Sequence, residues 1–342
     1  MRCALFAALA IVLLGGCSAI RYYAHVAGGE FALLARREAL ERAVVDPRLE
    51  PGVRARLQVA SEARRFASER LALPANRSYR SYVQLDRPYV SWNVFAAPEF
   101  SVEPVTHCFP FAGCVAYRGY FDRRLAEREA GRLARLGNDT AIVGVAAYST
   151  LGWFADPIVS SMLRGGDDAL VGTLFHELAH QRAYVAGDTA FNESYASFVE
   201  AEGLREWRAA RGLEAPDDAR GVRDAFTRGV LDLRERLRAL YAQDLPPARM
   251  RERKAAEIAA FRERHARDRA LQAHGYDAWV AAPINNASLV PFGVYDAWTG
   301  AFARLFQGCD GDWPRFHAAV RALARLAPDQ RQARLRELAP AG

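Results

Sequence analysis

Lysine is nearly absent from this chain of 342 residues: Lys254 is the only one, and every other basic residue apart from histidine is an arginine. The formal net charge of +6 therefore comes from arginines. These alternate with Glu and Asp, as in "ARREALERAVVDPR" and "RERKAAEIAAFRERHARDR", which is typical of solvated helix faces rather than of a basic groove. The sequence also lacks a nucleic-acid recognition module. We therefore expect no nucleic acid among its partners.

Internal repeats, low-complexity segments and obvious interdomain linkers are absent as well. The hydrophobic share of 51% and the charged share of 25% are ordinary for a globular protein, and a chain of this length can bury a large core. We predict a removable leader over residues 1–16, followed by one folded domain over residues 17–342.

The only long apolar run lies at the N-terminus, from Cys3 to Leu14. It has about the length of a signal-peptide h-region and is short for a membrane-spanning helix. "LLGGC" follows and resembles a bacterial lipobox, in which cleavage exposes Cys17 for acylation. An uncleaved anchor and an ordinary secretory signal are the alternatives. Ser18 resembles the residue found in lipoproteins of the outer membrane, so we predict a lipid-anchored chain facing the periplasm.

Cysteine is scarce, and two of the five cysteines belong to the predicted leader and lipid anchor. A structural zinc site would need four ligands of this kind, so a metal role for the remaining three is the weaker hypothesis. An oxidising periplasm favours disulfides. In "CFPFAGC", Pro110 and Gly113 turn the chain, so we predict a bridge between Cys108 and Cys114. Cys309 is then a small buried hydrophobic residue.

Three regions with different sequence patterns follow one another along the chain. Residues 27–73 show helical periodicity. Residues 81–153 contain short runs rich in Val, Tyr and Phe, typical of strands, with a helix at "DRRLAEREAGRLARL". Asp167 and Asp168 are predicted to cap a new helix, after which the chain is almost entirely helical. We predict an α+β fold, mostly helical, with a small mixed β-sheet.

The stretch "FHELAHQRAYVAGDTAFNESYASFVEAEG", residues 175–203, contains the strongest motif. His176 and His180 share one helix face, so both imidazoles can point at one zinc ion. Glu177 flanks that face and can reach water at the metal, as in His-Glu-x-x-His hydrolases. For the pentapeptide alone, two satisfied histidines on a buried face are the alternative.

The residues after this motif offer a third ligand. A turn at Gly187 and a second helix starting near Phe191 would bring Glu193 level with the two histidines. Three protein ligands with an open position for water are typical of catalytic zinc. The small Ala196 would let the helices approach closely. Glu200 is either a hydrogen-bond partner of a histidine N–H or a surface charge.

Five blocks together resemble a known family: "LLGGC", "CFPFAGCVAYRGYF", "YSTLGWFADPIVSSM", "LFHELAHQRAYVAGDTAFNESYASFVEAEG" and "INNASLVPFGVYDAW". They are similar to the putative aminopeptidase family of bacterial outer-membrane lipoproteins, zincins with a glutamate as third ligand. The resemblance implies a zincin-like fold with an active-site helix pair. It also implies one Zn²⁺ held by His176, His180 and Glu193, with Glu177 as base, and "YSTLGWF" as an edge strand for an extended peptide.

The developing oxyanion of a peptide hydrolase needs a donor besides the metal, and zincins of this type often use a tyrosine or a histidine. Tyr295 is our prediction because it lies in the fifth block. Tyr117 and Tyr120 in "VAYRGYF" compete with it.

One expected element is missing. Aminopeptidases with this zinc arrangement usually carry a Gly-x-Met-Glu-Asn strand that binds the substrate amine, and this chain offers only Asp156 in the corresponding region. We therefore predict a membrane-anchored zinc metallopeptidase acting on peptides, with aminopeptidase activity implied by resemblance. An endopeptidase or oligopeptidase, or a non-catalytic lipoprotein that binds envelope components, are the alternatives. Zinc is preferred over manganese or cobalt for this ligand set.

Overall fold

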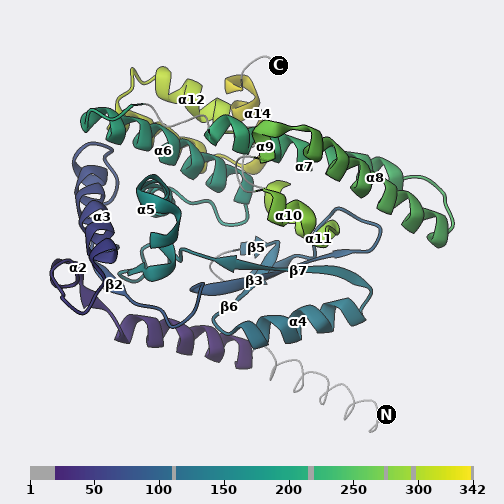
Figure 1. Ribbon diagram of the computed structural model, residues 1–342. Coiled ribbons are helices and arrows are strands. Elements are labelled where there is room, and N and C mark those ends of the chain that lie inside the picture. Colours follow the sequence, from purple (N-terminus) through teal and green to yellow (C-terminus); the bar gives the residue numbers. More distant parts are fainter. Residues whose placement is uncertain (1–19, 110–112, 215–218, 273–275, 294–297, 340–342) are drawn as a thin grey trace, which may run out of the picture.

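Helices surround a small set of strands in the computed structural model, and the chain is α+β (Figure 1). The structure describes residues 20–109, 113–214, 219–272, 276–293 and 298–339. The N-terminal helix (residues 20–35) and α4 (Arg123–Arg135) lie on one side of the strands. On the other side lie α5 (Gly166–Arg182), α6 (Thr189–Ala210) and the later helices. The mostly helical α+β prediction is confirmed, but the described strands form three small sheets rather than one.

The first sheet is mixed and joins distant parts of the chain. Its order is β1 (Glu38–Ala39), β2 (Ser81–Val83) and β8 (Ile158–Val159), with β1 antiparallel and β8 parallel to β2. Around it pack the short α2 (Leu40–Ala43) and α3 (Pro51–Glu69). The predicted helical region is therefore interrupted, because Pro51 is preorganised for the first turn of a new helix and cannot continue an earlier one.

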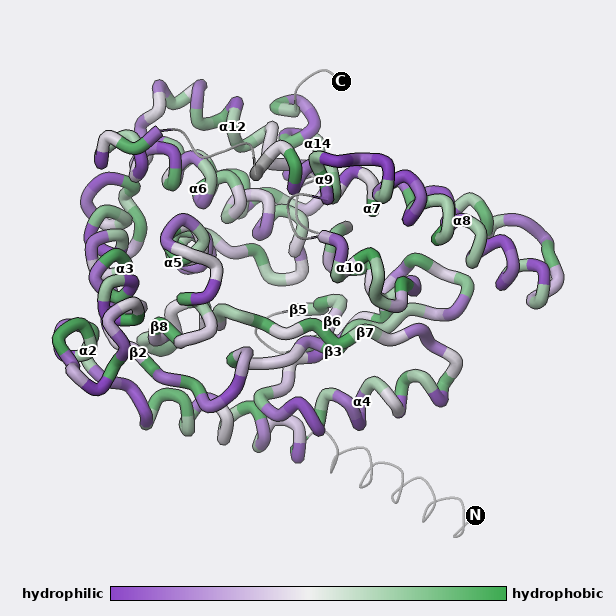
Figure 2. Tube along the Cα trace, viewed as in Figure 1, coloured by the Kyte–Doolittle hydropathy of each residue, from purple (hydrophilic) through white to green (hydrophobic). Residues whose placement is uncertain are grey.

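The central sheet is antiparallel, in the order β6 (Tyr117–Tyr120), β3 (Ser91–Pro98) and β7 (Asn138–Val145). Successive side chains of a strand point to opposite faces. Trp92, Val94 and Ala96 accordingly pack with residues of α4 (Arg123–Arg135), while Asn93 and Phe95 face the helices on the other side. Figure 2 shows hydrophobic stretches within β3 and β7.

The prediction that "YSTLGWF" forms an edge strand is wrong. Residues 148–154 form an irregular segment with a turn, and Leu151 and Gly152 have φ angles of 56° and 84°. The cause is Asp156, whose buried carboxylate accepts hydrogen bonds from the Thr150 N–H at 3.0 Å and from the Thr150 hydroxyl at 2.8 Å. These bonds fold the chain back on itself. β7, which ends shortly before this turn, is one of the two edge strands of the central sheet.

The motif stretch forms two helices, α5 (Gly166–Arg182) and α6 (Thr189–Ala210). Asp167 and Asp168 do not cap α5, as the sequence suggested, because Gly165 occupies the N-cap position. Both acids lie in the first turn, where the helix dipole favours negative charge. Asp188 caps α6 by accepting a hydrogen bond from the Phe191 N–H at 3.1 Å.

The C-terminal half is helical. Apolar residues of α7 (Ala219–Tyr241) and α8 (Pro247–Arg267) belong to a second hydrophobic cluster. The two helices extend outward as a pair (Figure 1). Among the described helices, none combines the length and the apolar character needed to cross a membrane. The remaining elements are η1 (Ser160–Gly165), α7 (Ala219–Tyr241), α8 (Pro247–Arg267), α9 (Arg269–Gln272), α10 (Asp277–Ala281), α11 (Asn286–Leu289), η2 (Val290–Gly293), α12 (Thr299–Gln307), α13 (Trp313–Ala324) and α14 (Pro328–Leu338).

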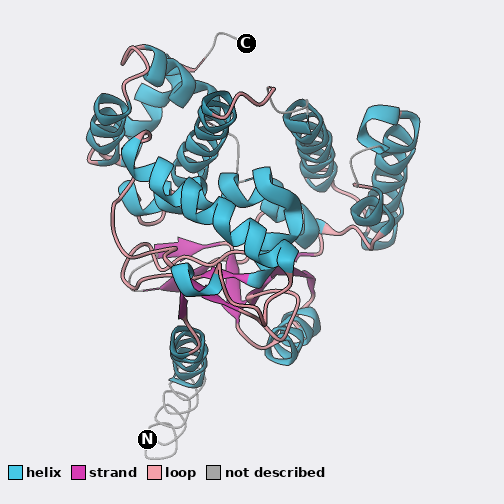
Figure 3. Ribbon diagram, turned by 60° about the vertical axis from the view of Figure 1, so that its left-hand side comes forward, coloured by secondary structure: helices cyan, strands magenta, loops and turns pink. Residues whose placement is uncertain are grey.

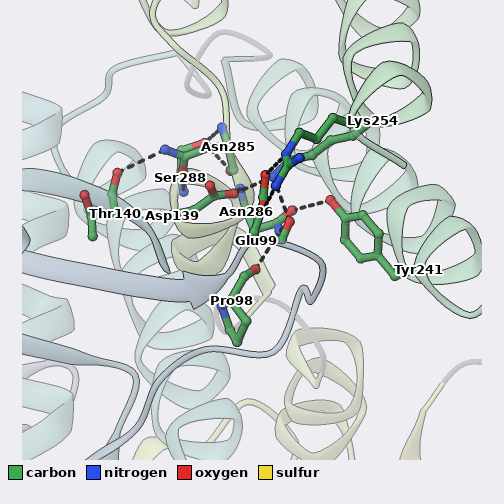
Figure 4. A network of polar contacts seen from close by, with 10 residues as sticks. Pro98, Glu99, Asp139, Thr140, Tyr241, Lys254, Asn285, Asn286 and Ser288 are labelled. Carbon is green, nitrogen blue, oxygen red and sulfur yellow. Dashed lines mark hydrogen bonds and ion pairs between the residues drawn. The ribbon is translucent and has the colours of Figure 1, made fainter. Parts of the chain in front are cut away.

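A polar network fastens α11 and α8 to the ends of β3 and β7 (Figure 4). The buried Asn286 donates to the carbonyls of Pro98 and Glu99, and its backbone N–H donates to Asp139. Lys254 reaches the same Asp139 carboxylate at 2.6 Å. These bonds hold the "INNAS" segment, residues 284–288, in place. The chain that follows it contributes Pro291 to the lining of the cavity described below.

Candidate metal centre and its cavity

The helices α5 and α6 pack directly on each other and are joined by the short connection at residues 183–188. Asn192 closes this connection: its side chain accepts from the Val185 N–H and donates to the Val185 carbonyl, both at 2.8 Å. Asp188 pairs with the buried Arg331 of α14 at 2.8 Å. Because both ends of the connection are fixed, the start of α6 is held in one position against α5.

This packing brings three potential metal ligands together. His176 Nε2 lies 3.1 Å from His180 Nε2 and 3.3 Å from Glu193 Oε2. His180 Nε2 lies 3.7 Å from Glu193 Oε1. Tetrahedral zinc with ligand bonds of about 2.0–2.1 Å holds its ligand atoms about 3.3 Å apart. The triangle therefore fits such an ion, and the three residues are the candidate metal site among the described residues.

Glu200 orients one of these ligands. Its Oε2 accepts a hydrogen bond from His176 Nδ1 at 3.0 Å, which leaves Nε2 directed at the other two residues. The absence of a side chain at Gly172, one turn before His176, makes room for this contact, since a Cβ there would lie 3.2 Å from Glu200. Of the two roles considered from sequence, the structure places Glu200 on the histidine.

Charge and burial oppose each other within this cluster. Burial by itself lowers the pKa of His176, but the hydrogen bonds to Glu193 and Glu200 raise it well above its usual range. For Glu193, burial raises the pKa, and the hydrogen bonds to both histidines outweigh it and lower the pKa to about 2. Glu193 is therefore held as a carboxylate, the form that ligates a metal.

Glu177 faces the cavity in front of the three ligands. Burial raises its pKa, and the neighbouring histidines oppose this effect. A carboxylate of raised basicity beside a metal position is suited to proton transfer.

The centre opens into a cavity of about 620 Å³ between the helix pair and the central sheet. Its floor comes from β3 and β6, its side from β7 and the segment that follows it, and a further wall from Tyr22 and Val26 of the N-terminal helix. Consecutive residues 143–149 of the edge strand and its extension border it. Among the described lining residues, the only charged or titratable acid–base groups besides tyrosines are His176, Glu177, His180 and Glu193.

Several tyrosines surround the centre. Tyr117 lies on the cavity floor, where burial raises its pKa and the charges of Glu193 and Glu177 raise it further. Tyr184, which sequence reasoning missed, lies beside His180 with ring centroids 6.3 Å apart; its spacing of four residues after that histidine was the available signal. Tyr120 packs with Trp92 and α4 residues. Tyr295 lies outside the described residues.

Two acidic residues lie behind the cavity wall. Asp156 is fully buried and its oxygens are occupied by Thr150, so it is not free to bind a substrate amine. Glu30 is 7% exposed, and its carboxylate interacts with the Tyr148 hydroxyl. Burial raises the pKa of Glu30 to about 7, and the charge of Asp156 adds to the effect.

A disulfide joins Cys108 and Cys114 and links β4 (His107–Phe109) to β5 (Gly113–Val115). Phe109 and Val115 of this hairpin line the cavity, so the bridge supports one of its walls. Cys309 is free and buried. Cys17 lies outside the described residues.

The chain is α+β and carries a His-Glu-x-x-His helix, a third carboxylate on the next helix and a cavity in front of them. These three ligand residues could hold a metal ion. The chain belongs to the family described as "Putative aminopeptidase", whose model matches residues 21–335. That membership suggests peptidase activity. No curated protein and no solved structure matches the chain.

Proposed function

We propose that this protein is a zinc-dependent aminopeptidase of the zincin type. The observation that carries the proposal is the triangle of His176, His180 and Glu193 ligand atoms, with Glu177 facing the same cavity. When bound there, Zn²⁺ supplies Lewis-acid polarisation of the scissile carbonyl and activation of water. Family membership supports the peptide bond as the reacting group.

The chain's own residues supply the remaining steps. Glu177 accepts the proton of the attacking water and delivers it to the leaving amine. Tyr117 donates a hydrogen bond from its hydroxyl to the developing oxyanion. This role is favoured by its place on the cavity floor beside the charges of Glu193 and Glu177. The part of edge strand β7 that borders the cavity, together with its extension over residues 146–149, binds the extended substrate through backbone hydrogen bonds.

The sign of charge in the cavity favours a free amine over a free carboxylate. Neither Lys nor Arg appears among its described lining residues, whereas Glu177 and Glu193 do. A carboxypeptidase needs a cation to hold the terminal carboxylate of its substrate. The positively charged N-terminus of a peptide meets no like charge from those lining residues, which makes an aminopeptidase the better fit.

The test compares fluorogenic aminoacyl amides with the same compounds blocked at the N-terminus, before and after removal of metal by a chelator. We expect hydrolysis of the free-amine set alone, abolished by chelation and restored by Zn²⁺. Cleavage of blocked or internal bonds would make the protein an endopeptidase. Absence of cleavage with zinc bound would favour a non-catalytic envelope-binding protein.

We further propose that Cys17 carries the lipid that holds the protein on the periplasmic side of the outer membrane. The "LLGGC" sequence supports this assignment. Labelled palmitate should be incorporated into the wild-type chain in cells and not into the Cys17→Ala variant. Equal labelling of both would show that the lipid is elsewhere.

A further inference from the structure

The N-terminal helix, residues 20–35, has an unusual composition for a helix at a protein surface. Its sequence is "IRYYAHVAGGEFALLA", in which Arg21 and Glu30 are the only acidic or strongly basic residues. Glu30 is buried. An amphipathic surface helix normally carries charged residues on its solvent side, so the exposed face of this helix calls for an explanation.

The inner face of the helix is accounted for by packing. Tyr22 and Val26 form part of the cavity wall, and Leu33 is buried in the main hydrophobic cluster. His25 Nε2 accepts a hydrogen bond from the Phe121 N–H at 3.1 Å. The helix is therefore fixed to the body of the protein along one side.

The outer face is apolar along its length. Ile20, Tyr23 and Phe31 are 69%, 45% and 66% exposed. Apart from Arg21 at its start, the other exposed residues of the helix are small and uncharged: Ala24, Ala27, Gly28, Ala32 and Ala35. Since Ile20 and Phe31 are three helical turns apart, they lie on the same side of the helix.

The neighbouring layer provides an internal comparison. The helix α4 lies on the same side of the strands, opposite α5 and α6, in both orientations shown (Figures 1 and 3). Its exposed residues are mostly charged, including Arg123, Arg124, Glu127 and Arg128. Exposure on this side of the molecule therefore does not require an apolar surface, and the apolar face is particular to the N-terminal helix.

The position of this helix in the chain indicates what covers the face. Ile20 follows the proposed acylation site by three residues, which span at most about 11 Å when fully extended. An acyl chain at Cys17 would therefore place the start of the helix at the bilayer surface. The exposed Arg21 at that end can approach anionic headgroups.

We propose that the outer face of the N-terminal helix lies on a lipid bilayer and inserts Ile20, Tyr23 and Phe31 at the boundary between headgroups and acyl chains. Amphipathic helices bind membranes in this way, through buried apolar area. The same helix forms a wall of the substrate cavity, so docking fixes the orientation of the cavity relative to the membrane. The geometry of the proposal rests on the proposed lipid anchor at Cys17.

The test isolates the affinity of the helix from that of the lipid. The chain from residue 17 to 342 carrying Cys17→Ser, which cannot be acylated, is sedimented with vesicles of phosphatidylethanolamine and phosphatidylglycerol. We expect it to bind, and we expect the double variant Ile20→Glu/Phe31→Glu to bind at least about tenfold more weakly, because charged residues on an interfacial face oppose insertion. Leu136→Glu, which alters a residue 66% exposed just after α4, is the matched control and should bind as the parent does.

Two readouts keep the outcome clear. Hydrolysis of a soluble substrate and the thermal midpoint should be the same in parent and double variant, which shows that the variant is folded. Vesicle binding requires no turnover, so it can be read even if the proposed peptidase activity is absent. Equal binding of parent and double variant, or no binding of either, would overturn the proposal. So would a dimer without vesicles that the double variant converts to monomer, since a second copy would then cover the face.

Discussion

The side-chain amide of Asn192 occupies both backbone hydrogen-bonding groups of Val185, with each bond 2.8 Å long. Asn192 is buried and directly precedes Glu193. The connection between α5 and α6 is thus tied to the residue next to the proposed third ligand. The position of Glu193 against the two histidines depends on this pair of bonds.

Replacing Asn192 by Ala should disturb the candidate centre through this connection. The N–H of Val185 loses its partner, while its carbonyl keeps a hydrogen bond from the Asp188 N–H at 3.1 Å. An unsatisfied buried group costs about 1–3 kcal/mol, which is the upper bound for this half-buried N–H. We expect a lower free energy of unfolding and weaker zinc retention after dialysis. Ser197→Ala, at a nearby position on the same helix, is the control. A variant with full metal content and unchanged stability would show that Asn192 does not hold the connection.

Glu177→Gln should separate catalysis from metal binding. The amide has nearly the same shape as the carboxylate but cannot take up a proton, so the rate should fall at least about a hundredfold while zinc content is retained. The paired variant Glu193→Ala removes a proposed ligand, so it should lose zinc. Near-normal turnover by Glu177→Gln would exclude it as the base, and full zinc retention by Glu193→Ala would point to another ligand.

Glu200→Gln should weaken zinc binding without removing a ligand. The carboxylate orients His176, and loss of such a partner typically costs about 10–100-fold in metal affinity. Gly172→Ala should reproduce part of the effect, because the added Cβ would lie 3.2 Å from Glu200. Competition with a chromogenic chelator measures both. Glu202→Gln, two residues along α6, is the control, and an equal effect there would make the role of Glu200 nonspecific.

Tyr117→Phe should lower kcat with little change in KM. Removal of one oxyanion donor costs about a hundredfold or more in rate, and the ring that lines the cavity remains. Steady-state kinetics of Tyr117→Phe, Tyr120→Phe, Tyr184→Phe and Tyr295→Phe compare the candidates, since Tyr117, Tyr120 and Tyr184 all line the cavity. If Tyr295→Phe alone loses kcat, the donor is the one predicted from sequence.

Glu30→Gln should change how stability depends on pH. Glu30 has a folded pKa of about 7, against an ordinary value of 4.5, mainly because it is buried. Between these values the unfolded chain has already released the proton that the folded chain still holds, so stability falls as pH rises and stays lower above pH 7.

Gln carries no proton to release, so the variant should gain relative stability between pH 5 and pH 8, by at most about 3 kcal/mol. Denaturant unfolding at the two pH values measures the difference. Glu127→Gln, on the exposed side of α4, is the control for the loss of one carboxylate charge. An equal stability difference between Glu30→Gln and the parent at both pH values would contradict the raised pKa.

The sequence determined those features that depend on short-range geometry. The spacing of His176 and His180 places them on one helix face because an α-helix has a period of 3.6 residues. The turn and capping residue at Asp188 start α6, close to the position expected from its sequence. The run "YVSWNVFAA", rich in β-branched and aromatic residues, likewise predicted a strand, and β3 forms there with nearly every residue buried.

The tertiary structure decided which side chains from distant segments come into contact. Sequence spacing could not distinguish Glu200 on a histidine from Glu200 in solvent, because that depends on the closeness of α5 and α6 at Gly172. Nor could it show that the carboxylate of Asp156 folds residues 148–154 into a turn, since β propensity there competes with a buried acid. Contacts between distant segments are set by packing of the whole chain, and local periodicity carries no information about them.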